Sequence, residues 1–234
     1  MTDEDEYKYK KDKCMDQDSL KDICVRFSKL YSGAIADMLD KQGFRDQVLP
    51  HFITPVTDVQ RVCGVAFTGQ GELSENVADD DTEKRLAMLD SITPLTISVW
   101  ACGGHTASAH WGEIMSTAAR ERGCLGAVVD GGVRDLNLID AMHFPVFARF
   151  KCAASSIGRW NIVRWQIPIK IGNTVINPRD FVFGDTDGVV IIPKNIIMEV
   201  LGQAEDVYAR ESGMRRELRQ GVSIKDAYKK YGAF

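Results

Sequence analysis

Arg134 and Asp135 stand side by side in a glycine-rich part of the sequence, and their types point to chemistry on small anions. An arginine guanidinium presents a fork of N–H donors that matches the two oxygens of a carboxylate. A single neighbouring aspartate suits a magnesium ion, which keeps several of its waters when bound to a protein. The pair therefore predicts a site for a small carboxylate that is chelated to a divalent metal.

The spacing between Glu113 and Arg134 predicts that these residues lie at the same end of one structural unit. We expect a helix over 113–122, a turn at Gly123 and a strand over 125–130. The helix would rise ~15 Å, and the strand would return by roughly 16–20 Å. Because the outward and return lengths nearly match, Glu113 and Arg134 are expected close together.

Two helix N-termini are expected at that end, one at Glu113 and one at Arg134, and each offers free backbone N–H groups and a positive dipole end. Gly112 and the pair 131–132 allow a ligand to approach the backbone closely. Taken singly, Glu113, Arg134 and Asp135 also fit structural roles as a first-turn acid, a surface ion-pair partner and a helix-start residue. Their occurrence together favours an anion site.

The composition is that of a cytoplasmic protein with one large domain or two small ones. The chain has 234 residues, of which 44% are hydrophobic, and this supports a proper core. The net charge is −4 without any basic stripe, so nucleic acid is not an expected partner. No apolar run is long enough to cross a bilayer, and the N-terminus lacks the features of a signal peptide.

The cysteines and histidines do not show the spacing of metal ligands. Four of the six cysteines lie in or beside apolar runs, which predicts buried, reduced thiols rather than zinc ligands or disulfides. The four histidines are equally scattered, at His51, His105, His110 and His143.

The remaining pattern predicts one α/β domain with a helical extension. Ser19 is a candidate cap for a first helix, and residues 69–81 are polar and punctuated by glycine, which predicts a loop. Further helices are expected over 33–42, 82–89, 134–142 and 194–216 and from residue 223, with strands over 61–68, 95–101, 145–150, 161–171, 182–183 and 189–192. The division is a flexible tail over 1–18, an α/β core over 19–193 and a C-terminal helical extension over 194–234 that packs on the core or on a neighbouring subunit.

The central motif resembles the family that unites ribonuclease-E regulator A with 4-hydroxy-4-methyl-2-oxoglutarate/4-carboxy-4-hydroxy-2-oxoadipate aldolase. An acidic residue, twenty intervening residues and an Arg-Asp pair form the signature of that aldolase group, and they run here from Glu113 to Arg134 and Asp135. The resemblance extends to Asp37 in an early helix and to the late strand before Pro193. The acid is a glutamate here, whereas the best-known aldolases have an aspartate.

The resemblance implies an architecture and a metal. The expected fold is a swivelling β/β/α-type single domain, assembled as a homotrimer or a dimer of trimers with its sites at subunit interfaces. Asp135 would hold Mg²⁺, or another divalent cation such as Mn²⁺, mostly through one carboxylate and waters. Arg134 would bind the substrate oxygens and stabilise a forming enolate.

The resemblance also implies roles for the residues around this pair. The backbone at Gly112, with the N–H groups of Ile114 and Met115, would bind the carboxylate of a pyruvoyl group. Glu113 would orient a water or a substrate group for proton transfer. Glu211 best matches a glutamate that reaches the site from the C-terminal helix of a neighbouring subunit.

The function implied is a metal-dependent lyase that cleaves a 4-hydroxy-2-oxo acid to pyruvate. Oxaloacetate decarboxylation is an expected side activity because it passes through the same enolate. Two alternatives stay open: a non-catalytic regulator that binds a protein partner, and a metal-dependent enzyme that acts on sugar acids or their lactones.

Overall fold

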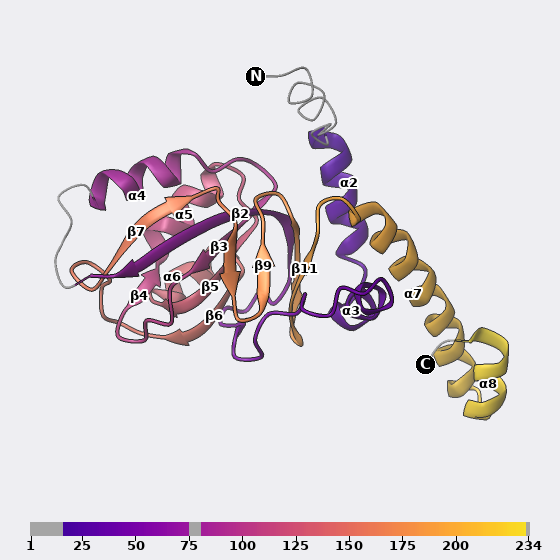
Figure 1. The fold of residues 1–234 in the computed structure, drawn as a ribbon. Helices are drawn as coiled ribbons and strands as arrows, with labels where there is room; N and C mark the ends of the chain where they lie inside the picture. The colour runs from indigo at the N-terminus through magenta and orange to yellow at the C-terminus, as the bar shows by residue number, and fades with distance from the viewer. Residues whose placement is uncertain (1–15, 75–80, 233–234) are drawn as a thin grey trace, which may run out of the picture.

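A nine-stranded sheet forms the centre of the structure, a computed structural model that describes residues 16–74 and 81–232 (Figure 1). Its strands are β1 (Thr54–Pro55), β2 (Val62–Leu73), β3 (Thr96–Ala101), β4 (Ala109–Trp111), β5 (Gly126–Val133), β6 (Val146–Lys151), β7 (Trp160–Trp165), β10 (Phe181–Asp185) and β11 (Gly188–Ile192). A separate hairpin joins β8 (Ile169–Ile171) to β9 (Thr174–Ile176). The helices are α2 (Gln17–Phe27), α3 (Ser32–Lys41), α4 (Asp81–Asp90), α5 (Glu113–Glu121), α6 (Leu136–Ala141), α7 (Ile197–Arg219) and α8 (Ile224–Tyr231).

The main path of the sheet runs β1-β6-β5-β3-β2-β10-β11, with β4 beside β5 and β7 beside β2. The pairs β2–β3, β3–β5 and β5–β6 are parallel, whereas β10 and β11 are antiparallel additions. The sheet curls into a nearly closed barrel around a mostly aliphatic cluster to which the β8–β9 hairpin contributes. This mixed sheet with covering helices confirms the expected α/β fold.

Two helical layers cover different parts of the sheet (Figure 1). One layer, of α2, α3 and α7, packs on β2, β10 and β11 through a cluster that includes Phe27 and Phe181. The other layer, of α4, α5 and α6, packs on the parallel strands through a second cluster. That cluster contains three fully buried indoles, Trp100, Trp111 and Trp160. The second layer places α5 and α6 beside the ends of β4 and β5.

The first helix begins earlier than predicted. The side chain of Asp16 caps it by accepting a hydrogen bond from the Ser19 N–H at 2.9 Å, so Ser19 lies inside the first turn rather than at the cap. An aspartate is as good a cap as a serine, and the apolar periodicity begins only at Leu20, which hid the true start. Of the expected tail, residues 16–18 therefore belong to the cap and first turn of α2, and 1–15 lie outside the described residues.

The predicted loop over 69–81 is wrong at both of its described ends. Strand β2 continues to Leu73 and pairs with β7, and α4 already begins at Asp81. Two glycines in this strand leave room for indole rings that pack against its backbone. A Cβ at Gly69 would stand 2.6 Å from the Trp100 ring, and one at Gly71 would stand 2.1 Å from the Trp160 ring. Glycine in a strand here marks close packing rather than a turn.

The C-terminal extension divides into two parts. The first half of α7 buries Ile197, Val200 and Leu201 against α2 and α3, so this half belongs to the core. Its second half packs against α8, where the Tyr231 ring lies so close to Gly213 that a Cβ would meet it at 2.4 Å. Figure 1 shows α7 and α8 projecting from the rest of the molecule. Within the described residues, no helix is both long enough and apolar enough to cross a membrane.

Replacing Phe27 by alanine is expected to lower the free energy of unfolding by about 3–5 kcal/mol. The Phe27 ring is fully buried and stacks on Phe181 with the ring centroids 4.5 Å apart, so its removal leaves a cavity between α2 and the sheet. Val25→Ala, on the same helix but half-exposed, is the matched control and should change stability little. Urea unfolding of both variants tests this, and equal losses would contradict the packing described.

Candidate functional site

The parallel pairing of β4 with β5 brings the two parts of the predicted site together. Trp111 pairs with Val133, and the next N–H along β5, that of Arg134, donates to the Trp111 carbonyl at 3.1 Å. The chain leaves both strands at this edge, so Gly112 and Arg134 lie next to each other. The predicted proximity of Glu113 to the Arg-Asp pair is confirmed as a matter of geometry.

The second helix terminus lies two residues later than predicted. Strand β5 runs to Val133, and α6 begins at Leu136 and has six residues. Asp135 is its N-cap and has a left-handed backbone with φ 61° and ψ 29°. A non-glycine residue in this region carries backbone strain, which proteins retain where a side chain must be aimed. The prediction that Arg134 starts a helix is therefore wrong, because the turn at Asp135 separates the strand from the helix.

The Asp135 carboxylate lies against the start of α5. Its Oδ2 accepts a long hydrogen bond from the Glu113 N–H at 3.4 Å and lies 3.3 Å from Arg134 Nε. A Cβ on Gly112 would stand 2.8 Å from the same oxygen, so a larger residue here would displace the Asp135 carboxylate. Both contacts use Oδ2, which leaves Oδ1 without an assigned partner in the part of the chain that the structure describes.

The N-terminus of α5 is open towards the same space. The first backbone hydrogen bond within the helix runs from the Ser116 N–H to the Gly112 carbonyl at 3.0 Å, and Gly112 offers no side-chain cap. Helix geometry therefore leaves the N–H groups of Ile114 and Met115 without an intrahelical acceptor. Such a terminus favours an anion through these N–H groups and the helix dipole.

The Glu113 carboxylate lies along its own helix, towards the C-terminal end. Its Oε1 accepts a hydrogen bond from the Thr117 hydroxyl at 2.7 Å, one turn further on. The Thr117 hydroxyl also lies 3.1 Å from the Met142 sulfur, at the end of α6. The carboxylate is thus held at the edge of the site rather than directed at Arg134.

The site residues line a hollow of about 180 Å³, and residues from three further segments of the chain complete its walls. Glu113, Ile114, Met115, Arg134 and Asp135 all contribute to it. Its other lining residues are Arg85, Ala109, His110, Trp111, Gly112, Ser155, Ser156 and Ile157. A second hollow of about 550 Å³ is also lined by Arg134 and Asp135, so this pair contributes to two depressions.

Arg85 is the lining residue that was hardest to expect from the sequence. Its Nε lies 2.8 Å from Asp81 Oδ2, and its Nη2 donates to the Trp160 carbonyl at 3.2 Å. It follows by four residues an aspartate that stands directly before the helix predicted over 82–89, which is the pattern of an ordinary surface ion pair. Only the packing of α4 against β7 turns this guanidinium towards the hollow.

Glu211 does not join these residues within the chain. It lies in the second half of α7, where its carboxylate accepts a hydrogen bond from the Tyr31 hydroxyl and forms an ion pair with Arg215. None of the lining residues of the two hollows comes from α7. A contribution from Glu211 to the site therefore requires a second copy of the chain.

The donor set at Asp135 fits a hard cation that keeps most of its waters. Among the described residues no group of three or more His, Cys, Asp or Glu side chains is arranged to hold a metal ion, which disfavours a closed site of the zinc type. Asp135 offers one partly exposed carboxylate beside an open hollow. Magnesium commonly binds through one or two carboxylates plus waters and substrate oxygens, so these residues fit Mg²⁺ or Mn²⁺.

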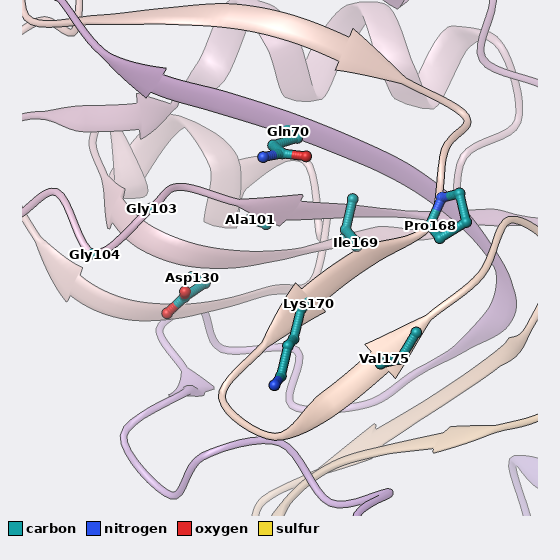
Figure 2. Close-up of a pocket in the computed structure, with 9 residues that line it drawn as sticks. All are labelled: Gln70, Ala101, Gly103, Gly104, Asp130, Pro168, Ile169, Lys170 and Val175. Atoms are coloured by element: carbon teal, nitrogen blue, oxygen red, sulfur yellow. The ribbon is translucent and has the colours of Figure 1, made fainter.

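A further hollow of about 500 Å³ lies at the carboxyl ends of β2, β3 and β5, under the β8–β9 hairpin (Figure 2). Gln70, Asp130 and Lys170 supply its polar side chains. Asp130 is mostly buried, and Oδ1 of its carboxylate accepts from Arg149 Nε at 2.9 Å. Burial raises the pKa of Asp130, and Arg149 opposes this. The Asp130 carboxylate is nearly buried and closely paired with Arg149, whereas that of Asp135 is partly exposed and only loosely paired with Arg134, so the hollow at Asp135 is the stronger candidate site.

Comparison with known proteins gives relatives along most of the chain. A protein of Halalkalibacterium halodurans, provisionally named 4-hydroxy-4-methyl-2-oxoglutarate aldolase, is 30% identical over 207 residues, which cover 88% of this chain and 93% of that protein. Protein DlpA of Legionella pneumophila is 25% identical over 228 residues. The match covers 94% of this chain but only 35% of DlpA, so the chain spans about a third of that relative.

Solved structures with this fold include an uncharacterized protein from Pseudomonas syringae, with a TM-score of 0.81 and 26% identity over 90% of this chain and 94% of that one. Streptomyces coelicolor RraAS2, an unusual member of the RNase ES inhibitor RraA protein family, has a TM-score of 0.74 at 22% identity, over 83% of this chain and 96% of that one. The family model for RraA-like proteins, described as Aldolase/RraA, matches residues 32–191, which include the whole β4–α5–β5 unit and its Arg-Asp pair. The chain therefore belongs to the RraA-like, Aldolase/RraA family.

Proposed function

We propose that this protein is a divalent-metal-dependent lyase that cleaves a 4-hydroxy-2-oxo acid to pyruvate and also decarboxylates oxaloacetate. The observation that carries the proposal is the placement of Arg134 and Asp135 beside the open N-terminus of α5. These groups suit a 2-oxo acid, which has a carboxylate and a neighbouring carbonyl oxygen. The relatives provisionally named as aldolases support the same reaction class.

The substrate carboxylate would bind at the start of α5, where the N–H groups of Ile114 and Met115 lack intrahelical acceptors. Arg134 would donate to the 2-oxo oxygen from the other side. Asp135 would hold Mg²⁺ or Mn²⁺ through its carboxylate and waters, and the cation would supply Lewis-acid polarisation of that 2-oxo group.

The cleavage step follows from this arrangement. The 4-hydroxyl loses its proton and becomes a carbonyl, the bond between C3 and C4 breaks, and its electron pair forms the enolate of pyruvate. Arg134 stabilises the negative charge that develops on the enolate oxygen. Glu113, held by Thr117 at the edge of the hollow, would orient the water that exchanges protons with the substrate. In oxaloacetate the bond to the departing CO₂ breaks instead, and the same enolate results.

Two other functions remain as alternatives. RraAS2 belongs to a family of RNase ES inhibitors, so a non-catalytic regulator that binds a protein partner is one of them. The other is a metal-dependent enzyme on sugar acids or lactones, which the same metal and arginine would serve. The chain keeps an open hollow with charged groups and free helix N–H groups, and this favours an enzyme with a small-molecule substrate.

Charge removal at Asp135 is expected to abolish most metal-dependent turnover. Asp135→Asn keeps the side-chain size and the tolerance for a left-handed backbone, so it changes mainly the charge. Pyruvate release from 4-hydroxy-4-methyl-2-oxoglutarate and from oxaloacetate should fall about 10²-fold or more, because Lewis-acid stabilisation is worth several kcal/mol. A chelator should silence the wild type. Absence of metal-dependent turnover of either substrate by the wild type would refute the lyase proposal.

Truncation of Arg134 is expected to act mainly on kcat. Arg134→Ala should lower kcat by about 10²–10³-fold, with a smaller effect on KM, because the lost interaction is made chiefly with the developing enolate. Arg134→Lys keeps the charge without the planar fork and should fall between the wild type and the alanine variant. A near-normal kcat for Arg134→Ala would show that its assigned role is wrong.

The proposed assembly is a homotrimer or a dimer of trimers, in which α7 of one subunit brings Glu211 to the site of the next. Glu211→Gln is then expected to lower turnover about 10²-fold as a loss of proton transfer, without changing the mass in sedimentation analysis. Glu199→Gln, near the start of the same helix, is the matched control. A monomeric mass for the wild type, or unchanged turnover of Glu211→Gln, would count against this arrangement.

A further inference from the structure

Two irregularities in strand pairing meet directly before the Arg-Asp pair. The register between β4 and β5 shifts between Ala109 and Trp111, and the register between β5 and β6 shifts between Val129 and Gly132. A bulge of this kind bends a strand, redirects the following side chains and leaves backbone groups outside the regular ladder. The geometry at His110 and Gly132 therefore sets the direction in which the chain leaves β5 at Arg134.

The N–H of Gly132 donates its hydrogen bond to a histidine ring rather than to a backbone carbonyl. This N–H donates to Nδ1 of His110 at 3.0 Å. The opposite ring nitrogen, His110 Nε2, lies 3.0 Å from Nδ1 of His105. The Ser108 hydroxyl lies 3.2 Å from the same His105 nitrogen. The bulge is thus tied through two imidazoles to the loop between β3 and β4.

These contacts allow only one proton arrangement. Because His110 Nδ1 accepts from a backbone N–H, it carries no proton, and the ring proton must lie on Nε2. That Nε2–H then donates to His105 Nδ1, which must also be unprotonated. Both rings are therefore neutral, and each carries its proton on Nε2. A second proton on His110 would point Nδ1–H at the Gly132 N–H, and a second proton on His105 would point Nδ1–H at His110 Nε2–H.

Packing holds the pair in place. His105 and His110 are both buried, and the edge of His110 meets Trp160 with the ring centroids 4.9 Å apart. A Cβ on Gly131 would stand 2.4 Å from His110 Nδ1, so the ring lies directly on the β5 backbone. Burial, then the neighbouring His105 and Arg85, lower the pKa of His110 to about 4. Burial and Arg159 lower the pKa of His105.

We propose that His110, fixed by His105 as the neutral Nε2–H form, is a positioning residue that holds the β4–β5 bulge and so orients Arg134 and Asp135 against α5. His110 reaches these groups through the backbone, because its ring bonds to Gly132 and not to either side chain. The inference rests on the proposed function for its kinetic consequence. Its structural consequence, a protected Gly132 N–H beneath a neutral ring, holds whatever the reaction is.

The first test is nuclear magnetic resonance of the full chain with ¹⁵N-labelled histidine and glycine at pH 7. The His110 and His105 rings should each show a protonated Nε2 and an unprotonated Nδ1, and the Gly132 amide should exchange slowly with solvent. His110→Leu should lose the Gly132 protection, whereas His110→Asn should retain it, because its side-chain oxygen can lie near the position of Nδ1. A proton on Nδ1 of His110, or a fast-exchanging Gly132 in the wild type, would overturn the proposal.

The second test compares turnover of the same variants. His110→Leu should lower kcat about 10–100-fold, which is the usual loss when a residue that orients the groups in direct contact with a metal is removed. Its KM should change less, and His110→Asn should restore most of the activity. His105→Leu leaves His110 Nε2–H without its acceptor and should lower kcat as well. This variant serves as the test if His110→Leu fails to fold. Full activity of folded His110→Leu refutes the positioning role, whereas an inactive wild type refutes the lyase and leaves the resonance test to decide.

Acidification supplies a third readout. The charged groups that act on the pair are Arg85 on α4 and Arg159 before β7. Cys102, after β3, lies with His110 beside Gly131, and the Asp130–Arg149 pair acts on Cys102. Between pH 6.5 and about 4 the unfolded chain protonates His110 while the folded chain does not, so stability falls as the pH falls. The unfolding equilibrium constant should rise by up to about tenfold per pH unit from this residue alone. His110→Asn should show a shallower dependence, and identical curves would contradict the proposal.

Discussion

The close approach of the Asp135 carboxylate to the backbone of Gly112 is the constraint on which the rest of the site depends. A Cβ at Gly112 would stand 2.8 Å from the carboxylate oxygen, so any larger residue would push this carboxylate away from the start of α5. The parallel pairing of β4 with β5 sets that distance, and the left-handed turn at Asp135 directs the side chain into it. Movement of either strand by one residue would separate the Asp135 carboxylate from the N-terminus of α5.

The charges at this point are balanced before any ligand arrives. The Asp135 carboxylate faces both the positive end of α5 and the Arg134 guanidinium, and each is only loosely engaged, at 3.4 and 3.3 Å. A cation at Asp135 would draw the carboxylate from these partners and free them for an incoming carboxylate or enolate oxygen. In the proposed lyase, cation and anion binding would therefore reinforce each other, since each relieves a contact that would compete with the other.

The sequence predicted the helix–turn–strand unit and the proximity of Glu113 to Arg134, because these depend on local periodicity and on lengths along one stretch of chain. It did not predict the extent of β2, because Gly69 and Gly71 resemble loop residues until Trp100 and Trp160 are known to lie against them. It also missed Arg85 and the pairing of His105 with His110. The partners of these side chains come from distant segments or from an irregular loop, where spacing along the sequence carries no signal.

The three buried tryptophans behind the site have an optical consequence. Trp100 lies within 6.5 Å of the Trp111 ring and 6.1 Å of the Trp160 ring, measured between centroids. Trp111 immediately precedes Gly112, and Trp160 contacts both His110 and, through its carbonyl, Arg85. Indoles this close exchange excitation energy, so a change at any one of them alters the emission of all three. The protein thus carries a cluster of intrinsic fluorophores in contact with the backbone of the candidate site, to which Trp165 adds a fourth, partly buried emitter.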